Sequence, residues 1–261
     1  MNAWNVLPDV WQIQDDMGVC MTLLCGKARA LLIDTGYGMA DVAQYVTALT
    51  DKPVSVVLTH AHHDHALGAR WFKDVRMFAQ DLPDFAVYTA RAQRERVLAQ
   101  ANAKGLVPPE DFLTAEIPLP EPLEEGDIDL GGLTARIILC PGHTPGSAVV
   151  YVPQRALLLT GDDWNPCTWL FFPAALGAQA YRQNVRGLLS LPFKHVLCSH
   201  QPHLYERAIF ETFLAGLTDE CLLAARKVDM GWPVDTREAS PAQGQIFVFD
   251  FGKTTLKEKD A

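Results

Sequence analysis

One apolar run leads directly into a histidine-rich segment: Pro53-Val-Ser-Val-Val-Leu58 is followed by Thr59-His60-Ala61-His62-His63-Asp64-His65. The apolar, β-branched run predicts a buried strand. The segment 59–65 then lies at the carboxyl end of that strand, where α/β sheets commonly place their ligands. His60 and His62 are two positions apart and would not share a helix face, so a loop must bring them together. Because imidazole and carboxylate groups suit Zn²⁺, Fe or Mn, the segment predicts metal binding.

The same layout, a buried strand that ends at a ligand-type residue, recurs three times downstream. The runs 137–140, 157–160 and 195–198 lead to His143, Asp162 and His200, with small neighbours that let the backbone approach closely. Each of these residues alone could equally be a turn or surface residue. Together with the segment 60–65 they supply five histidines and two aspartates, which is enough for two metal ions.

This set of motifs resembles the metallo-β-lactamase superfamily from about residue 8 to about residue 203. H-x-H-x-D-H stands at 60–65, P-G-H-T-P-G-S at 141–147, Gly-Asp after a strand at 161–162 and Ser-His at 199–200. The run 31–36, Leu-Leu-Ile-Asp-Thr-Gly, matches the family's first motif. The resemblance implies an α/β (α+β) fold, a four-layer αββα sandwich of two mixed β-sheets flanked by helices. We expect one domain over 1–261, with a helical insertion at about 84–117.

The resemblance also implies two metal sites that share one carboxylate and a bridging hydroxide. Two zinc ions are expected, with Fe or Mn as the alternative. Asp64 and Asp162 are the expected catalytic residues, and Asp64 would orient the nucleophile and pass a proton to the leaving group. The implied ligands are His60, His62 and His143 for the first metal, Asp64, His65 and His200 for the second, and Asp162 for both.

Three further residues near the motifs receive different roles. Asp34 would hydrogen-bond the loop that holds the histidines, as carboxylates behind metal ligands commonly do. His63 fills the variable position of its motif and is not expected to bind metal. His195, which precedes a strand, reads as a surface or structural residue.

The presence of Asp162 narrows the reaction that the resemblance implies. True β-lactamases of this fold carry Cys or Ser in the corresponding region, whereas thioesterases, lactonases and phosphodiesterases of the superfamily carry the aspartate. The run 161–172, Gly-Asp-Asp-Trp-Asn-Pro-Cys-Thr-Trp-Leu-Phe-Phe, departs from the pattern of glyoxalase II and the persulfide dioxygenases. We therefore predict a zinc hydrolase of a small ester, lactone or thioester. A mononuclear iron oxidoreductase of the persulfide dioxygenase type and a nucleic-acid phosphodiesterase are the alternatives.

Composition limits the partners and the compartment. The 261 residues include 22 Lys+Arg and 31 Asp+Glu, a net charge of −9, which argues against a nucleic-acid partner. The apolar run 170–178 is far shorter than the ~20 residues of a membrane-spanning helix. No basic and apolar leader is read, and the six cysteines include no C-x-x-C pair, so reduced thiols and a cytoplasmic location are expected. We expect a small-molecule substrate and no membrane partner. The sequence is compatible with a homo-oligomer.

Two segments are candidates for the substrate pocket. The insertion is read as one helix over 84–104 with a Pro-rich loop at 106–125, and it would form a pocket wall, a lid or plain scaffold. Outside the insertion, the sequence predicts another long helix over 205–227. Aromatic residues after Asp162 would line an apolar pocket or lie in the core. The candidate substrate contacts are Trp164, Trp169, Phe171, Phe172 and His203.

Overall fold

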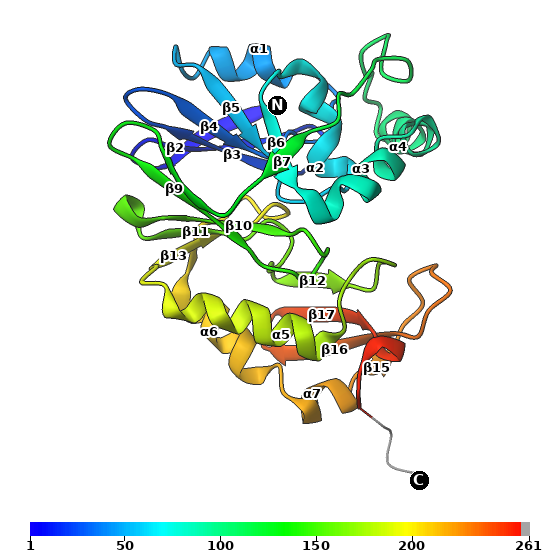
Figure 1. The fold of residues 1–261 in the computed structure, drawn as a ribbon. Coiled ribbons are helices and arrows are strands. Elements are labelled where there is room, and N and C mark those ends of the chain that lie inside the picture. Colours follow the sequence, from blue (N-terminus) through cyan, green and yellow to red (C-terminus); the bar gives the residue numbers. More distant parts are fainter. Residues whose placement is uncertain (257–261) are drawn as a thin grey trace.

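The computed structural model describes residues 1–256, which form two large sheets and one small sheet with helices on both outer sides (Figure 1). The first sheet is mixed: its first four strands are antiparallel and the last three run parallel to β4. Its strands lie in chain order: β1 (Asn2–Leu7), β2 (Val10–Gln14), β3 (Cys20–Cys25), β4 (Ala30–Ile33), β5 (Val54–Val57), β6 (Val75–Phe78) and β7 (Glu121–Leu123).

The second sheet is also mixed, because β11 and β13 are parallel while its other neighbours are antiparallel. Its order is β14 (Tyr205–Glu206), β13 (His195–Leu197), β11 (Leu157–Leu159), β10 (Ala148–Val152), β9 (Thr134–Leu139) and β8 (Gly126–Asp129). A third sheet, which the sequence did not predict, has the order β12 (Cys167–Leu170), β17 (Gln245–Asp250), β16 (Thr236–Ala242) and β15 (Arg226–Lys227).

The helices cover the outer faces of the two large sheets, as the αββα prediction requires (Figure 1). One group covers the first sheet: α1 (Val42–Thr47), α2 (His63–Ala66), α3 (Leu82–Tyr88) and α4 (Arg91–Ala103). The other group follows β12: α5 (Ala178–Gly187), α6 (Arg207–Gly216) and α7 (Asp219–Leu223). Short 3₁₀ turns span Leu67–Trp71, Ala79–Asp81, Pro153–Arg155, Leu188–Ser190 and Phe251–Lys253. None of the helices described is long and apolar enough to cross a membrane.

Side-chain alternation along the strands builds the layers. Leu31 and Ile33 of β4 pack between the two sheets, whereas Leu32 of the same strand packs toward α1 with Val42. On the far side of the second sheet, a third core includes Val149 of β10. It also contains aromatic residues of α5, α6 and β17: Tyr181, Phe210, Phe213 and Phe247. The small sheet therefore extends the core beneath the second large sheet.

Three predicted elements are divided in the structure. The helix expected over 84–104 is divided into α3 and α4, because the backbone of Ala90 is extended at the boundary. The helix expected over 205–227 is a short strand, two helices and a second short strand. The N-terminal run 6–14, whose apolar residues predict a single strand, turns at Asp9, whose φ is 63°, and contributes to the hairpin of β1 and β2. The Pro-rich loop also contains β7.

Candidate metal centre

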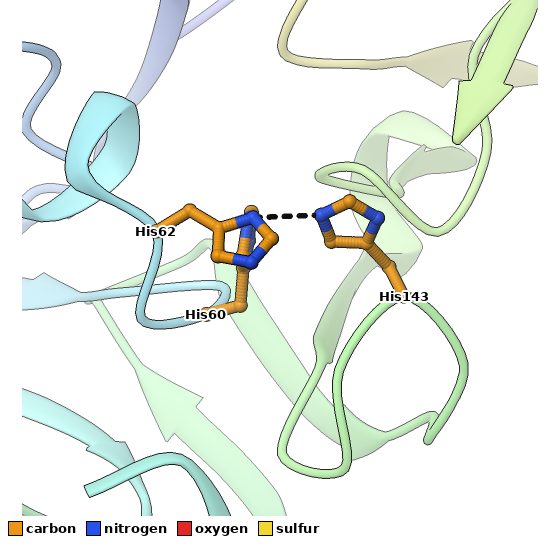
Figure 2. Close-up of side chains that lie close together, drawn as sticks. All are labelled: His60, His62 and His143. Carbon is orange, nitrogen blue, oxygen red and sulfur yellow. Dashed lines mark hydrogen bonds between the residues drawn. The ribbon is translucent and has the colours of Figure 1, made fainter. Parts of the chain in front are cut away.

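Three histidines from two loops converge on one point (Figure 2). His60 and His62 follow β5, and His143 follows β9, so the two large sheets each supply part of the group. All three side chains are buried, and the ligand atoms of the group lie within 4.8 Å of one another. His62 Nδ1 and His143 Nε2 face each other at 2.9 Å. This geometry matches a metal site that takes one nitrogen from each ring.

The hydrogen bonds of these rings determine which nitrogens are available. The Thr59 hydroxyl lies 2.9 Å from Asp34 Oδ2, to which it donates, so it accepts from His60 Nδ1 at 3.0 Å. His143 Nδ1 donates to the Trp169 carbonyl at 2.7 Å. His60 Nε2 is buried and has no hydrogen-bond partner within residues 1–256. The lone pairs of His60 Nε2 and His143 Nε2 are therefore directed into the group, as metal ligation requires.

A second group lies beside the first and contains two carboxylates. Its members, Asp64, His65, Asp162 and His200, also present ligand atoms within 4.8 Å of one another. His200 Nε2 lies 2.9 Å from Asp162 Oδ2. The same oxygen lies 3.6 Å from His65 Nε2 and 3.7 Å from His143 Nε2. Asp162 Oδ2 therefore stands between the two groups, which is the position expected of a shared ligand.

Asp34 supports both groups from behind. Its Oδ1 accepts from the Thr59 backbone N–H at 2.7 Å, and its Oδ2 lies 2.9 Å from His65 Nδ1. The bond to Nδ1 leaves His65 Nε2 directed at the second group, where it has no hydrogen-bond partner within the described chain. Asp34 itself has a φ of 63°, in the left-handed region at the end of β4. The side chain thus holds the 59–65 loop as the sequence predicted.

The two groups differ in charge. Burial, reinforced by the neighbouring histidines, holds the pKa of His60 and His62 well below 6.5. Burial acts the same way on His65, but Asp64, Asp34 and Asp162 outweigh it and raise its pKa. The pKa of His200 is raised as well, since Asp162 offsets the effect of burial. The surroundings thus favour neutral imidazole at His60 and His62, and favour the charged forms of His65 and His200 beside the carboxylates.

Two buried aspartates that sequence reasoning missed connect the loops. Asp81 accepts from the Ala61 backbone at 3.2 Å, from the Thr144 hydroxyl at 2.7 Å and from the Gly146 backbone at 2.6 Å. It therefore ties the loop of His60 and His62 to the loop of His143. Asp163 accepts from the His143 backbone N–H at 2.9 Å, and burial raises its pKa to about 8. Asp163 follows a motif residue directly, whereas nothing in the sequence around Asp81 indicates its role.

A cavity of about 550 Å³ opens beside both groups, within the size range of ligand pockets. His62, Asp64, His143, Asp162 and His200 line its floor. One wall comes from the predicted insertion, which supplies Tyr88, Gln93, Arg96, Val97 and Gln100 from α3 and α4. The opposite wall comes from β12, the segment after it and the loop between β15 and β16, and it contains Cys167, Trp169, Phe172 and Trp232.

The five candidate substrate contacts separate into two sets. Trp169 and Phe172 line the cavity, and the Phe172 ring lies 4.7 Å from that of His62. Trp164 was placed wrongly as a pocket residue, since it is fully buried against Phe210 and Tyr205 in the core beneath the second sheet. Phe171 and His203 do not line the cavity either. Phe171 is buried behind the cavity wall, where its ring packs against Trp169, Phe172 and Trp232. His203 packs its exposed ring on Tyr205.

His63 and His195 lie outside both groups. His63 lies at the mouth of the cavity, with its ring 6.2 Å from Tyr88 and 5.6 Å from Tyr37. His195 begins β13, and its Nδ1 lies 3.4 Å from Glu206 on the neighbouring strand. Neither residue belongs to a cluster of metal-ligand type within residues 1–256.

Comparisons with known proteins agree with this architecture. The acyl-coenzyme A thioesterase MBLAC2 of Gallus gallus is 28% identical over 74% of this chain and 70% of its own length. A hydroxyacylglutathione hydrolase of Cereibacter sphaeroides is 28% identical over 61% of this chain and 52% of its own. The solved sec-alkylsulfatase Pisa1 of a Pseudomonas species shares the fold, with a TM-score of 0.63 at 18% identity over 83% of this chain and 40% of that one.

The family model of the metallo-β-lactamase superfamily matches residues 15–200, and that range includes every residue of the two groups. The fold and the His/Asp groups of this family imply the use of a divalent metal. The chain therefore belongs to the metallo-β-lactamase superfamily, as an enzyme whose named relatives are hydrolases.

Proposed function

We propose that this protein is a dinuclear metal-dependent hydrolase that cleaves acyl thioesters, or closely related small esters and lactones. The observation that carries the proposal is the position of Asp162 Oδ2, which approaches a histidine of each group within 3.7 Å. A single metal at His60, His62 and His143 would leave His65, His200 and two carboxylates without a function. The names of two relatives, an acyl-coenzyme A thioesterase and a hydroxyacylglutathione hydrolase, support an acyl substrate.

Different residues would hold the metals and transfer the proton. His60, His62 and His143 would hold the first metal and Asp64, His65 and His200 the second, with Asp162 shared; two zinc ions suit these ligands best. Divalent metals held there would supply an activated water and would polarise a carbonyl oxygen. Asp64 lies on the cavity floor 3.5 Å from His200 Nε2, where its carboxylate can orient the attacking water and deliver a proton to the leaving sulfur.

The cavity wall that contains Cys167, Trp169, Phe172 and Trp232, which we call the aromatic wall, favours an apolar acyl group. Trp169 and Phe172 lie beside His143, whose Nδ1 is held by the Trp169 carbonyl itself. An acyl chain packed on these rings would present its carbonyl to the metals and displace water from the floor of the cavity. This partly aromatic cavity of about 550 Å³ suits a small molecule better than a nucleic-acid backbone, which needs a surface rich in Lys and Arg.

Metal analysis combined with a substrate panel tests the proposal. Purified protein is expected to contain two zinc ions per chain and to hydrolyse acyl thioesters in preference to lactones, β-lactams and phosphodiesters. A chelator should abolish the activity, and zinc should restore it. One iron per chain together with oxygen consumption and no hydrolysis would overturn the proposal in favour of an oxidoreductase. Hydrolysis of phosphodiesters alone would overturn it in favour of a nuclease.

A further inference from the structure

One face of α4 points polar side chains into the cavity. Gln93, Arg96, Val97 and Gln100 all line it, and their spacing of three, four and seven positions places them on a single side of the helix. A helix face that packs against a protein core is normally apolar. Here Val97 alone is apolar and buried, and the other three positions carry two amides and a guanidinium. Arg96 and Gln100 are exposed and Gln93 is half-buried, so a molecule in the cavity can reach all three polar side chains.

Arg96 differs from the two arginines next to it in the helix. Arg91 pairs with Glu95 at 2.9 Å, and Arg94 donates to the backbone carbonyls of Phe112 and Ala115 at 3.0 and 2.7 Å. Within residues 1–256, the side chain of Arg96 makes no hydrogen bond or ion pair, and the same holds for Gln93 and Gln100. The donors of these three side chains are therefore available to a bound molecule.

Outside the metal-binding floor, the described lining of the cavity offers an anion one fixed cation. Among the described residues that line it, Arg96 is the only lysine or arginine. In Figure 1, α4 lies on the same side of the molecule as the loop between β15 and β16. That loop carries Trp232, which faces the cavity from the aromatic wall. The cavity thus combines a metal-binding floor, an aromatic wall and one cationic, amide-bearing wall.

We infer that Arg96, assisted by Gln93 and Gln100, binds a carboxylate or phosphate on the thiol carrier of the substrate. The inference rests on the proposed function, in which the acyl group lies on Trp169 and Phe172 and the carrier extends along α4. A guanidinium can donate two parallel hydrogen bonds to either anion, and the amide groups add donors on both sides along the helix. The substrate class is therefore an apolar acyl group joined through sulfur to an anionic thiol.

A set of butyryl thioesters that differ only in the thiol tests the inference. The neutral thiol is N-acetylcysteamine, the carboxylate is mercaptopropionate and the phosphate is phosphopantetheine. The wild-type protein is expected to show a higher kcat/KM for an anionic thioester than for the neutral one. In Arg96→Gln the anionic-to-neutral ratio of kcat/KM should fall about ten- to a hundredfold, as expected for the loss of a charged hydrogen bond. The anionic thioester that shows the larger fall in this ratio identifies the group that Arg96 binds.

Arg91→Gln is the matched control, since it removes an arginine of the same helix that is paired with Glu95 and lies outside the cavity. An unchanged ratio in Arg96→Gln, or an equal fall in Arg91→Gln, would overturn the inference while hydrolysis itself continued. Calorimetry with the non-hydrolysable thioether of mercaptopropionate separates the two proposals. Binding of this probe that depends on Arg96, without hydrolysis of any thioester, would support the anion site and refute the proposed reaction.

Discussion

At the scale of single residues, substitution of Asp162 and substitution of His200 should lower the metal content to different extents. Asp162 Oδ2 approaches His65 and His143, whereas among residues 1–256 the ion-pair partners of His200 Nε2 are Asp64 and Asp162. Asp162→Ala should therefore lower the occupancy of both metal sites, and His200→Ala should mainly empty the second. Elemental analysis of the purified variants should give well below two metals per chain for the first and about one for the second.

His203→Ala is the matched control for His200→Ala, because this exposed histidine lies three residues away and outside both groups. It should retain the wild-type metal content. Two tightly bound metals in Asp162→Ala would contradict the shared ligand. Equal loss from both sites in His200→Ala, with an unchanged circular dichroism spectrum, would contradict the division into two sites.

At the scale of elements, one glycine allows the turn that follows α2 to pack on the loop that follows β4. A Cβ at Gly68 would overlap the Thr35 carbonyl, and Thr35 holds the chain next to His65 through two hydrogen bonds. Gly68→Ala should lower the free energy of unfolding by about 1–3 kcal/mol, since overpacking forces the backbone to shift. Gly187→Ala, at the end of α5, has open space and should raise it by about 0.5–1 kcal/mol. Urea denaturation of both variants measures this contrast, and equal effects would contradict it.

The boundaries between elements show where sequence patterns stop being informative. The strands that carry the histidines were predictable, because each is a short apolar run that ends at a polar motif. The break at Ala90 was not, since Thr89 and Ala90 are compatible with a helix and the extended backbone of Ala90 has no signal in the sequence. β16 contains Pro241 and no alternating pattern, so its pairing with β17 depends on tertiary contacts. The third sheet escaped prediction for this reason.

The residues of the two metal-binding groups were predictable from the sequence, whereas the residues of the surrounding cavity wall were predictable only in part. Every residue of the two groups stood in a motif, because metal ligation restricts residue type as well as spacing. Trp164 and Trp169 carry the same side chain five positions apart, yet one lies in the core and the other in the cavity wall. That choice depends on β12, which adds to the small sheet beside β17 and turns Trp169 outward. A sheet formed by residues 79 positions apart, such as Leu170 and Phe249, leaves no local signal.

At the scale of the whole molecule, the two groups lie where the two large sheets meet. The segment 59–65 belongs to the first sheet, whereas His143, Asp162 and His200 follow strands of the second. Metal bound to residues of both halves therefore stabilises the folded chain relative to the unfolded one, in which these ligands are far apart. Asp81, which links Ala61 with Thr144 and Gly146 across the same boundary, provides a connection that does not need metal.

This arrangement predicts that the thermal midpoint of unfolding depends on metal concentration. At free zinc a hundred times the dissociation constant, one site adds about 2.7 kcal/mol, equivalent to an increase of about 5–10 °C for a chain of this size. Differential scanning calorimetry should show a lower Tm after chelation and a stepwise recovery on titration with zinc. Asp162→Ala should lose most of this dependence, while His203→Ala should keep it. A Tm that is independent of metal in the wild-type protein would mean that the groups do not couple the two halves, because any ligand that prefers the folded state must raise its stability.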